Sequence, residues 1–319
     1  MWQITKAILG QRMLAVVARD KMEKAFVALD QKTNRIVMRH GPIDLFVKID
    51  ADDPNVLGAA LRFMNEPLGE ILPSLCEELP VLLTNVEHIA FPPKGTIAEK
   101  MCESAASFSG FDMVTPMISV AGSVADYVCG LIDDNFETRR IIVNNGGDIA
   151  FKLDQDQTMA VGICDDVTAP DISTTVTLGW LDPVGGIATS GWRGRSFSLG
   201  IADAVTVLAT TASQADTAAT LIANAVDLPG SPKVIRQSAI ELSPDSDLEE
   251  RKVTVDVGAL SQPEISQALL NGAEIAECMK AAGLIHSAYL SLRGHRRVVC
   301  SPVGVRTGSN SHQLNHIAI

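Results

Sequence analysis

Hydrophobic and polar positions alternate near the start of the chain, a period typical of β-strands. Turn-forming residues interrupt this alternation at 32–34 and 40–42, which predicts a meander of short strands instead of one long element. The predicted strands lie at 25–29, 35–39 and 45–49.

Further along, apolar residues recur at intervals of three and four, the spacing of a helix with one buried face. In 116–132 this face is accompanied by the small residues Ala121, Gly122 and Ser123, which permit close packing against a sheet. The predicted helices lie at 55–66, 97–108, 116–132, 213–226 and 264–282.

Runs rich in β-branched residues, bounded by Gly, Asn, Asp or Pro, fill much of the second half. Runs of strands are followed by pairs of helices, without a regular strand–helix alternation, so we expect an α+β fold with a largely antiparallel sheet. We expect one domain over 1–300 and a polar C-terminal tail at 301–319. The predicted strands lie at 140–143, 149–153, 159–164, 174–178, 205–209, 253–257 and 286–300.

Charge, hydropathy and cysteine spacing indicate which partners and which cell compartment to expect. A formal net charge of -12 opposes non-specific binding to nucleic acid. No apolar run reaches the length of a membrane span, and the first residues lack a signal-peptide pattern, so we expect a cytoplasmic protein without a membrane partner. The six cysteines are far apart and mostly in apolar runs, which predicts unpaired thiols. A homo-oligomer is possible, because the sequence does not determine the oligomeric state.

The first candidate for chemistry is the N-G-G-D segment after an apolar strand. Gly146 and Gly147 permit positive φ and a close approach of backbone to a ligand. Asn145 and Asp148 could bond the edge of a heterocycle or a ribose hydroxyl. The alternative is a plain hairpin turn, which Asn-Gly between strands also predicts.

The second candidate is 185–200, which we expect to be a loop. Its hydroxyls on Thr189, Ser190 and Ser198 and its guanidinium groups on Arg193 and Arg195 could hold a phosphate or carboxylate. The alternative is a surface loop without a ligand.

The third candidate is a pair on the helix predicted at 213–226. Asp216 and Thr220 are four residues apart and share one face, so their oxygens could bind Mg²⁺. Alternatively, Asp216 only favours the helix dipole. The start of the helix at 116–132 is a fourth candidate, either for an anion or only for tight packing.

Together these segments resemble the ApbE-like superfamily, whose best-known members are Mg²⁺-dependent FAD:protein FMN transferases. They are most similar to a small branch of it, over roughly residues 40–230. The motifs that carry the resemblance are T-P-M-x-S-V-A-G at 115–122, N-G-G-D at 145–148, S-x-G-x-A-D-A-V at 198–205 and A-D-x-x-A-T at 215–220.

The resemblance implies two T-fold-like halves with the ligand between them. It implies that Asp216 and Thr220 bind Mg²⁺, with a backbone carbonyl near Val124 as a third contact. The family's His and its D-P-x-T-G loop are replaced here by 197–203. Asp203, in that replaced loop, is the remaining candidate for a catalytic acid or base.

The residues and the resemblance together leave three functions open. The first is an enzyme or binder that acts on a flat nitrogen heterocycle, flavin-like or pterin-like, with optional Mg²⁺. The second is an FAD:protein FMN transferase with a non-standard base. The third is a non-catalytic protein that binds a ligand or partner. Because the His is missing, we predict no FMN transfer to an acceptor protein.

Overall fold

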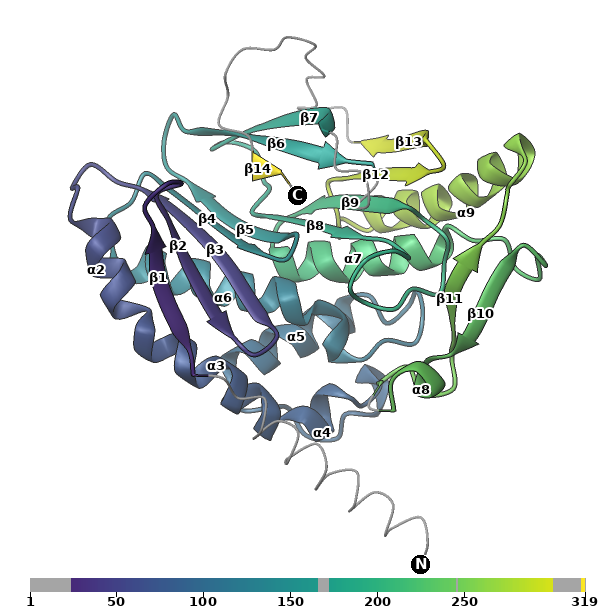
Figure 1. The fold of residues 1–319 in the computed structure, drawn as a ribbon, viewed down its shortest axis with the longest axis horizontal. Coiled ribbons are helices and arrows are strands. Elements are labelled where there is room, and N and C mark those ends of the chain that lie inside the picture. Colours follow the sequence, from purple (N-terminus) through teal and green to yellow (C-terminus); the bar gives the residue numbers. More distant parts are fainter. Residues whose placement is uncertain (1–23, 166–171, 245, 301–316, 319) are drawn as a thin grey trace, which may run out of the picture.

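The computed structural model describes residues 24–165, 172–244, 246–300 and 317–318. A nine-stranded sheet forms its centre, in the order β1-β2-β3-β4-β5-β8-β9-β12-β13, and every neighbouring pair is antiparallel (Figure 1). The predicted α+β fold with largely antiparallel strands is confirmed. The strands are β1 Phe26–Asp30, β2 Arg35–His40, β3 Ile43–Asp50, β4 Arg140–Asn145, β5 Asp148–Leu153, β8 Gly186–Ser190, β9 Ala204–Ala209, β12 Ser287–Leu292 and β13 His295–Cys300.

A smaller sheet covers part of one face of the central sheet. It contains β6 (Thr158–Cys164), β7 (Ile172–Gly179) and β14 (Ile317–Ala318), and β14 runs parallel to β6. Apolar side chains of both sheets, such as Phe151 and Val161, form a shared buried cluster. Of the tail predicted at 301–319, only β14 lies within the described residues.

Helices cover the opposite face of the central sheet (Figure 1). One buried cluster joins β2, β3 and β4 to the helices of the N-terminal half, and another joins β8, β9 and β12 to α7 and α9. Two strands, β10 (Val234–Ser238) and β11 (Lys252–Val257), form a separate pair. The helices are α2 Val56–Phe63, α3 Asn65–Glu77, α4 Leu79–Leu82, α5 Thr96–Ser107, α6 Val120–Asn135, α7 Ala212–Ala225, α8 Ala239–Leu242 and α9 Gln262–Ala281, with 3-10 turns η1 Val86–His88 and η2 Pro116–Ser119.

Helices α6 and α7 approach each other closely where both begin. A Cβ atom added to Gly122 would lie 2.3 Å from the carbonyl oxygen of Ala212. No larger residue fits there without movement of the backbone, so Gly122 packs against the start of α7.

Strand β8 corrects the prediction that 185–200 is a loop throughout. Residues 186–190 form a strand between β5 and β9 in the middle of the central sheet. Gly186 lies against the start of α7, where an added Cβ atom would be 2.1 Å from the backbone nitrogen of Ala212. Only glycine fits at position 186, because the backbone at the start of α7 lies so close. Gly186 has a low strand propensity, but hydrogen bonding of β8 to β5 and β9 on either side outweighs it.

Two other sequence expectations have structural outcomes. The prediction of unpaired thiols is confirmed for Cys76, Cys102, Cys129, Cys278 and Cys300. Among the described residues, no helix is long and apolar enough to cross a membrane. The single domain over 1–300 and its two T-fold-like halves stay predictions.

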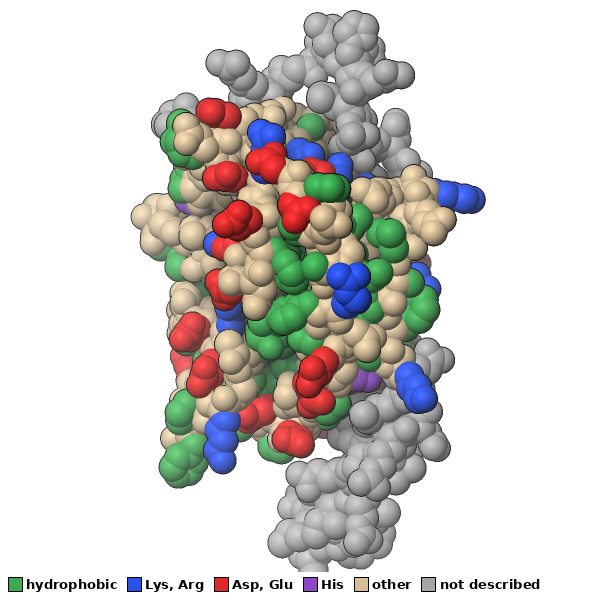
Figure 2. Space-filling view, turned by 90° about the vertical axis from the view of Figure 1, so that its left-hand side faces the viewer, with side chains coloured by type: hydrophobic (Ala, Val, Ile, Leu, Met, Phe, Trp, Pro, Cys, Tyr) green, Lys and Arg blue, Asp and Glu red, His purple; other side chains and the backbone are tan. Residues whose placement is uncertain are grey.

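The surface is less uniform than the net charge suggests. On the face seen from the β1 side, hydrophobic side chains gather near the middle and acidic ones lie mostly along one side (Figure 2). Phe26 on β1 and Phe46 on β3 are among the exposed apolar side chains of the molecule. An acidic chain therefore still offers apolar surface at its sheet.

Candidate functional site

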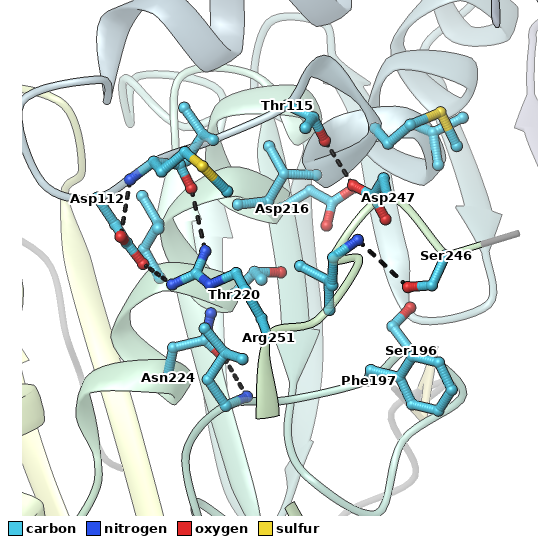
Figure 3. A pocket seen from close by; sticks show the side chains of 18 of the residues that line it. Asp112, Thr115, Ser196, Phe197, Asp216, Thr220, Asn224, Ser246, Asp247 and Arg251 are labelled. Carbon is cyan, nitrogen blue, oxygen red and sulfur yellow. Dashed lines mark hydrogen bonds and ion pairs between the residues drawn. The ribbon is translucent and has the colours of Figure 1, made fainter. Parts of the chain in front are cut away.

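A pocket of about 340 Å³ lies where several segments distant in sequence meet. It is bordered by η2 and the start of α6, by the first residue of β5, by 195–199, by α7 and by 246–251 (Figure 3). Its volume is within the usual range for small-molecule sites. Apolar and charged side chains line it together, which suits a ligand with both kinds of surface.

Four predicted site residues line this pocket. Asp148 comes from β5, Arg195 from the loop after β8, and Asp216 and Thr220 from one face of α7. The spacing of four residues on α7 places both of its side chains toward the same space. Met117, Ile118, Val120 and Ala121 also line the pocket, so the structure brings together all four segments that the sequence singled out.

A hydrogen bond joins the turn between β4 and β5 to the start of α6. Gly146 and Gly147 have φ of +68° and +115°, in the region that favours glycine, and Asn145 pairs with Asp148 across the turn. The Asn145 side-chain amide donates to the carbonyl oxygen of Ala121 at 3.0 Å. The segment therefore forms the hairpin turn expected as the alternative to a ligand site. Asp148, at the end of this turn, lines the pocket.

Arg195 lies directly over this turn. A Cβ atom added to Gly146 would be 1.5 Å from an Nη atom of Arg195. The missing side chain at Gly146 is therefore what leaves room for the guanidinium group. No carboxylate of the described residues lies within ion-pair distance of Arg195.

The carboxyl groups of Asp148 and Asp216 both have raised pKa values. Burial raises the pKa of Asp148 well above its usual value, the charge of Asp216 raises it further, and Arg195 opposes both effects. Burial likewise raises the pKa of Asp216 to about 7, although the backbone N–H of Gly122 donates to it at 3.0 Å. Two carboxyl groups so placed hold a proton near neutral pH unless a cation stabilises their charged forms.

The start of α6 also borders the pocket, through residues one turn before Val124. Val120 and Ala121 line the pocket. Val124, the position expected to supply a carbonyl to Mg²⁺, is buried and is not among the lining residues.

Besides Asn145, Gly146 and Gly147, four more predicted ligand-binding residues are absent from the pocket lining. On β8, Thr189 bonds the hydroxyl of Thr206 at 2.8 Å, and Ser190 pairs with Val205. Arg193 lies over the Trp192 ring, 4.9 Å from its centroid.

Ser198, the fourth of them, is nearly fully buried. Its hydroxyl donates to the side-chain oxygen of Asn224 at 3.3 Å, and its backbone carbonyl accepts from Thr254. Ser198 thus fastens the loop that carries Arg195 and Phe197 to α7 and β11.

Asp203, the predicted acid or base, is also absent from the pocket lining. It is buried, and its carboxylate accepts from Trp192 Nε1 at 3.3 Å and from the backbone N–H of Arg293 at 2.5 Å. These contacts join the start of β9 to the turn between β12 and β13. They indicate a structural role for Asp203.

The structure adds pocket residues that the sequence did not indicate. Asp247 accepts from the hydroxyl of Thr115 at 2.5 Å, and Arg251 forms an ion pair with Asp112 at 2.8 Å (Figure 3). Phe197 also lines the pocket, with 39% of its surface exposed. Both pairs join residues more than 130 positions apart, so no local pattern could have shown them.

A protein-family model described as AbpE bacteria matches residues 27–298. The chain belongs to this family. The resemblance drawn from the four motifs is therefore confirmed at the level of the family.

Members and structures similar to this AbpE-family chain come from archaea and bacteria. A UPF0280 protein of Methanothermobacter thermautotrophicus is 34% identical over 184 residues, covering 56% of this chain and 67% of its own length. A UPF0280 protein of Methanopyrus kandleri is 32% identical over 211 residues, covering 66% and 82%. The crystal structure of Pseudomonas stutzeri flavinyl transferase ApbE in its apo form is 11% identical, with a TM-score of 0.41 over 87% of this chain and 94% of that one.

Proposed function

We propose that the pocket binds a flat, anionic nitrogen heterocycle of the flavin or pterin type, with Mg²⁺ held by Asp216 and Thr220. The observation that carries this proposal is the meeting of Asp148, Arg195 and Asp216 in a pocket that also has apolar side chains. Membership of the AbpE family supports a flavin-related function.

The apolar side chains suit the faces of a ring system. Met117, Ile118, Phe197 and Leu199 all line the pocket. A flat heterocycle buries two apolar faces and keeps polar atoms at its edge, so it needs apolar contacts together with a few hydrogen-bonding groups. Asp148 is placed to supply such a group.

The acidic side of the pocket fits a divalent cation. Mg²⁺ prefers oxygen ligands from one or two carboxylates, and it keeps several waters. Asp216 supplies a carboxylate, Thr220 a hydroxyl, and both line the same space. A bound Mg²⁺ would stabilise the charged form of Asp216, whose pKa is otherwise raised by burial. It would also offset the repulsion between these carboxylates and an anionic ligand.

Thermal unfolding of the full chain with riboflavin 5′-phosphate, with and without Mg²⁺, tests the proposal. A ligand that binds only the folded state raises the unfolding midpoint. We expect the flavin to raise it, Mg²⁺ to enlarge the shift, and Asp216→Ala to remove the Mg²⁺ effect. Asp256→Ala is the matched control, because Asp256 is an exposed carboxylate on β11 outside the pocket. No shift with flavins or pterins under either condition would refute the proposal.

FMN transfer with a non-standard base is a second candidate, and Asp148 favours it. The pKa of Asp148 is raised, as a general base near neutral pH requires, and the side chain lines the pocket. Incubation with FAD, Mg²⁺ and an acceptor protein tests this. Covalent flavin that Asp148→Asn abolishes would establish transfer; flavin binding without covalent product would leave only the first proposal.

A further inference from the structure

A second hollow shares the lining residue Arg195 with the pocket. It measures about 650 Å³ and is lined by Lys24, Phe26, Arg39, residues 40–44 and Arg195. Arg195 is the residue that borders both spaces. A ligand in the pocket could therefore extend past this one guanidinium group into the hollow.

The hollow is basic, although the chain as a whole is acidic. Lys24, Arg39 and Arg195 line it, and Asp44 is its one lining carboxylate. Asp44 accepts from Nε of Arg39 at 2.9 Å, which leaves the two Nη groups of that guanidinium for other partners. His40 also lines the hollow, but its side chain is buried, and its Nδ1 atom lies 3.2 Å from the carbonyl oxygen of Leu68.

The position of Arg195 depends on the turn beneath it. The guanidinium group occupies the space that any side chain at Gly146 would fill. The β4–β5 turn therefore helps to set where the guanidinium group of Arg195 lies, and Arg195 lines both spaces. Within the described residues Arg195 has no ion-pair partner, so its charge is available to a ligand at this boundary.

We propose that the hollow binds the phosphoryl tail of the ligand whose ring occupies the pocket, through Arg195, Arg39 and Lys24. This inference rests on the proposed function and adds the chemical class of the tail. Three cations around one carboxylate favour a multiply charged anion over a single carboxylate. Guanidinium groups bind phosphate oxygens in pairs, and an ammonium group adds a point charge.

Two probes test this on the full chain by isothermal titration: inorganic pyrophosphate alone, and riboflavin compared with its 5′-phosphate. We expect pyrophosphate to bind, with an affinity that falls at high salt. We expect riboflavin 5′-phosphate to bind more tightly than riboflavin. Arg39→Gln should weaken pyrophosphate binding about fivefold, the size of one exposed charge pair, and should reduce the advantage of the phosphorylated flavin.

Two further variants separate a ligand contact from a structural effect. Arg35→Gln removes the same charge from the same strand, but Arg35 does not line the hollow, so binding should not change. Asp44→Asn removes the opposing charge and should strengthen pyrophosphate binding about threefold, again on the scale of an exposed pair. A merely structural role for Asp44 would not produce a gain.

The outcomes distinguish this inference from the proposed function. Equal affinities for riboflavin and its 5′-phosphate, with no pyrophosphate binding, would overturn the tail site and leave the ring site standing. Pyrophosphate binding that Arg39→Gln and Arg35→Gln weaken equally would also overturn it. Pyrophosphate binding with the expected pattern, but no flavin or pterin binding, would support the anion site and refute the proposed ring ligand.

Discussion

Asp126 and Asp216 lie on neighbouring helices, and each accepts hydrogen bonds from the backbone at the start of the other helix. Asp126 on α6 accepts from the N–H groups of Ala212 and Ser213 at 2.9 and 3.0 Å. Asp216 on α7 accepts from the N–H of Gly122 at 3.0 Å. Helix starts have unsatisfied N–H groups and a positive dipole end. This exchange fixes α6 and α7 at the site that Asp216 and Ala121 line.

The contact between α6 and α7 should not tolerate a side chain at Gly122. Because an added Cβ atom would lie 2.3 Å from a backbone oxygen of Ala212, Gly122→Ala should lower the free energy of unfolding by about 1–3 kcal/mol or more. Gly130→Ala on the same helix is the control, since no atom lies within 4 Å of its added Cβ. That variant should be neutral or stabilising by up to about 1 kcal/mol. Equal midpoints in urea for the two variants would contradict the packing described.

Stability should depend on pH through Asp216. Burial raises its pKa to about 7 from an ordinary 3.8, so the folded chain holds this proton more tightly than the unfolded chain. Between these values the contribution of Asp216 to the free energy of unfolding falls as pH rises, and it levels off above about pH 7.

Asp216→Asn removes this titration. Relative to the unsubstituted chain, the variant should therefore gain stability as pH increases from about 4 to 7, as measured by urea unfolding at several pH values. Mg²⁺ should restore stability to the unsubstituted chain at the upper end of the range and leave Asp216→Asn unchanged. A constant difference between the two proteins across this range would show that the pKa is not raised.

Gly146→Ala should displace Arg195 and weaken binding of an anionic ligand. The φ of +68° adds backbone strain of about 1–2 kcal/mol to the effect of the clash. Gly294→Ala is a matched control, because Gly294 has a φ of +76° in the β12–β13 turn and no atom within 4 Å of an added Cβ. Both variants should lose the stability that this backbone strain costs, and Gly146→Ala should lose more because of its clash with Arg195. Only Gly146→Ala should lose affinity for riboflavin 5′-phosphate. Equal affinities of the two variants for riboflavin 5′-phosphate would show that Arg195 does not contact this ligand.

Asp203→Asn should act on stability and not on binding. The Asp203 carboxylate accepts from Trp192 and from the backbone of Arg293 in a buried position. An asparagine presents an N–H donor to one of these donors, so the free energy of unfolding should fall by about 1–3 kcal/mol. Flavin affinity, measured well below the unfolding midpoint, should stay the same. A large loss of flavin affinity without a loss of stability would contradict this prediction and indicate that Asp203 contacts the ligand.

The sequence by itself determined the local parts of this site. Turn chemistry at Gly146 and Gly147 and the spacing of four residues between Asp216 and Thr220 depend only on near neighbours in the chain. The class of fold followed from the order of strands and helices for the same reason.

The tertiary structure decided which of the candidates meet. Arg193 and Arg195 are equivalent in local sequence, yet only Arg195 lies over Gly146 and lines the pocket, while Arg193 lies over Trp192. Strand β8 forms because β5 and β9 pair with it, and Asp247 reaches Thr115 from 132 residues away. Such contacts arise from packing between distant segments, which residue patterns along the chain do not encode locally.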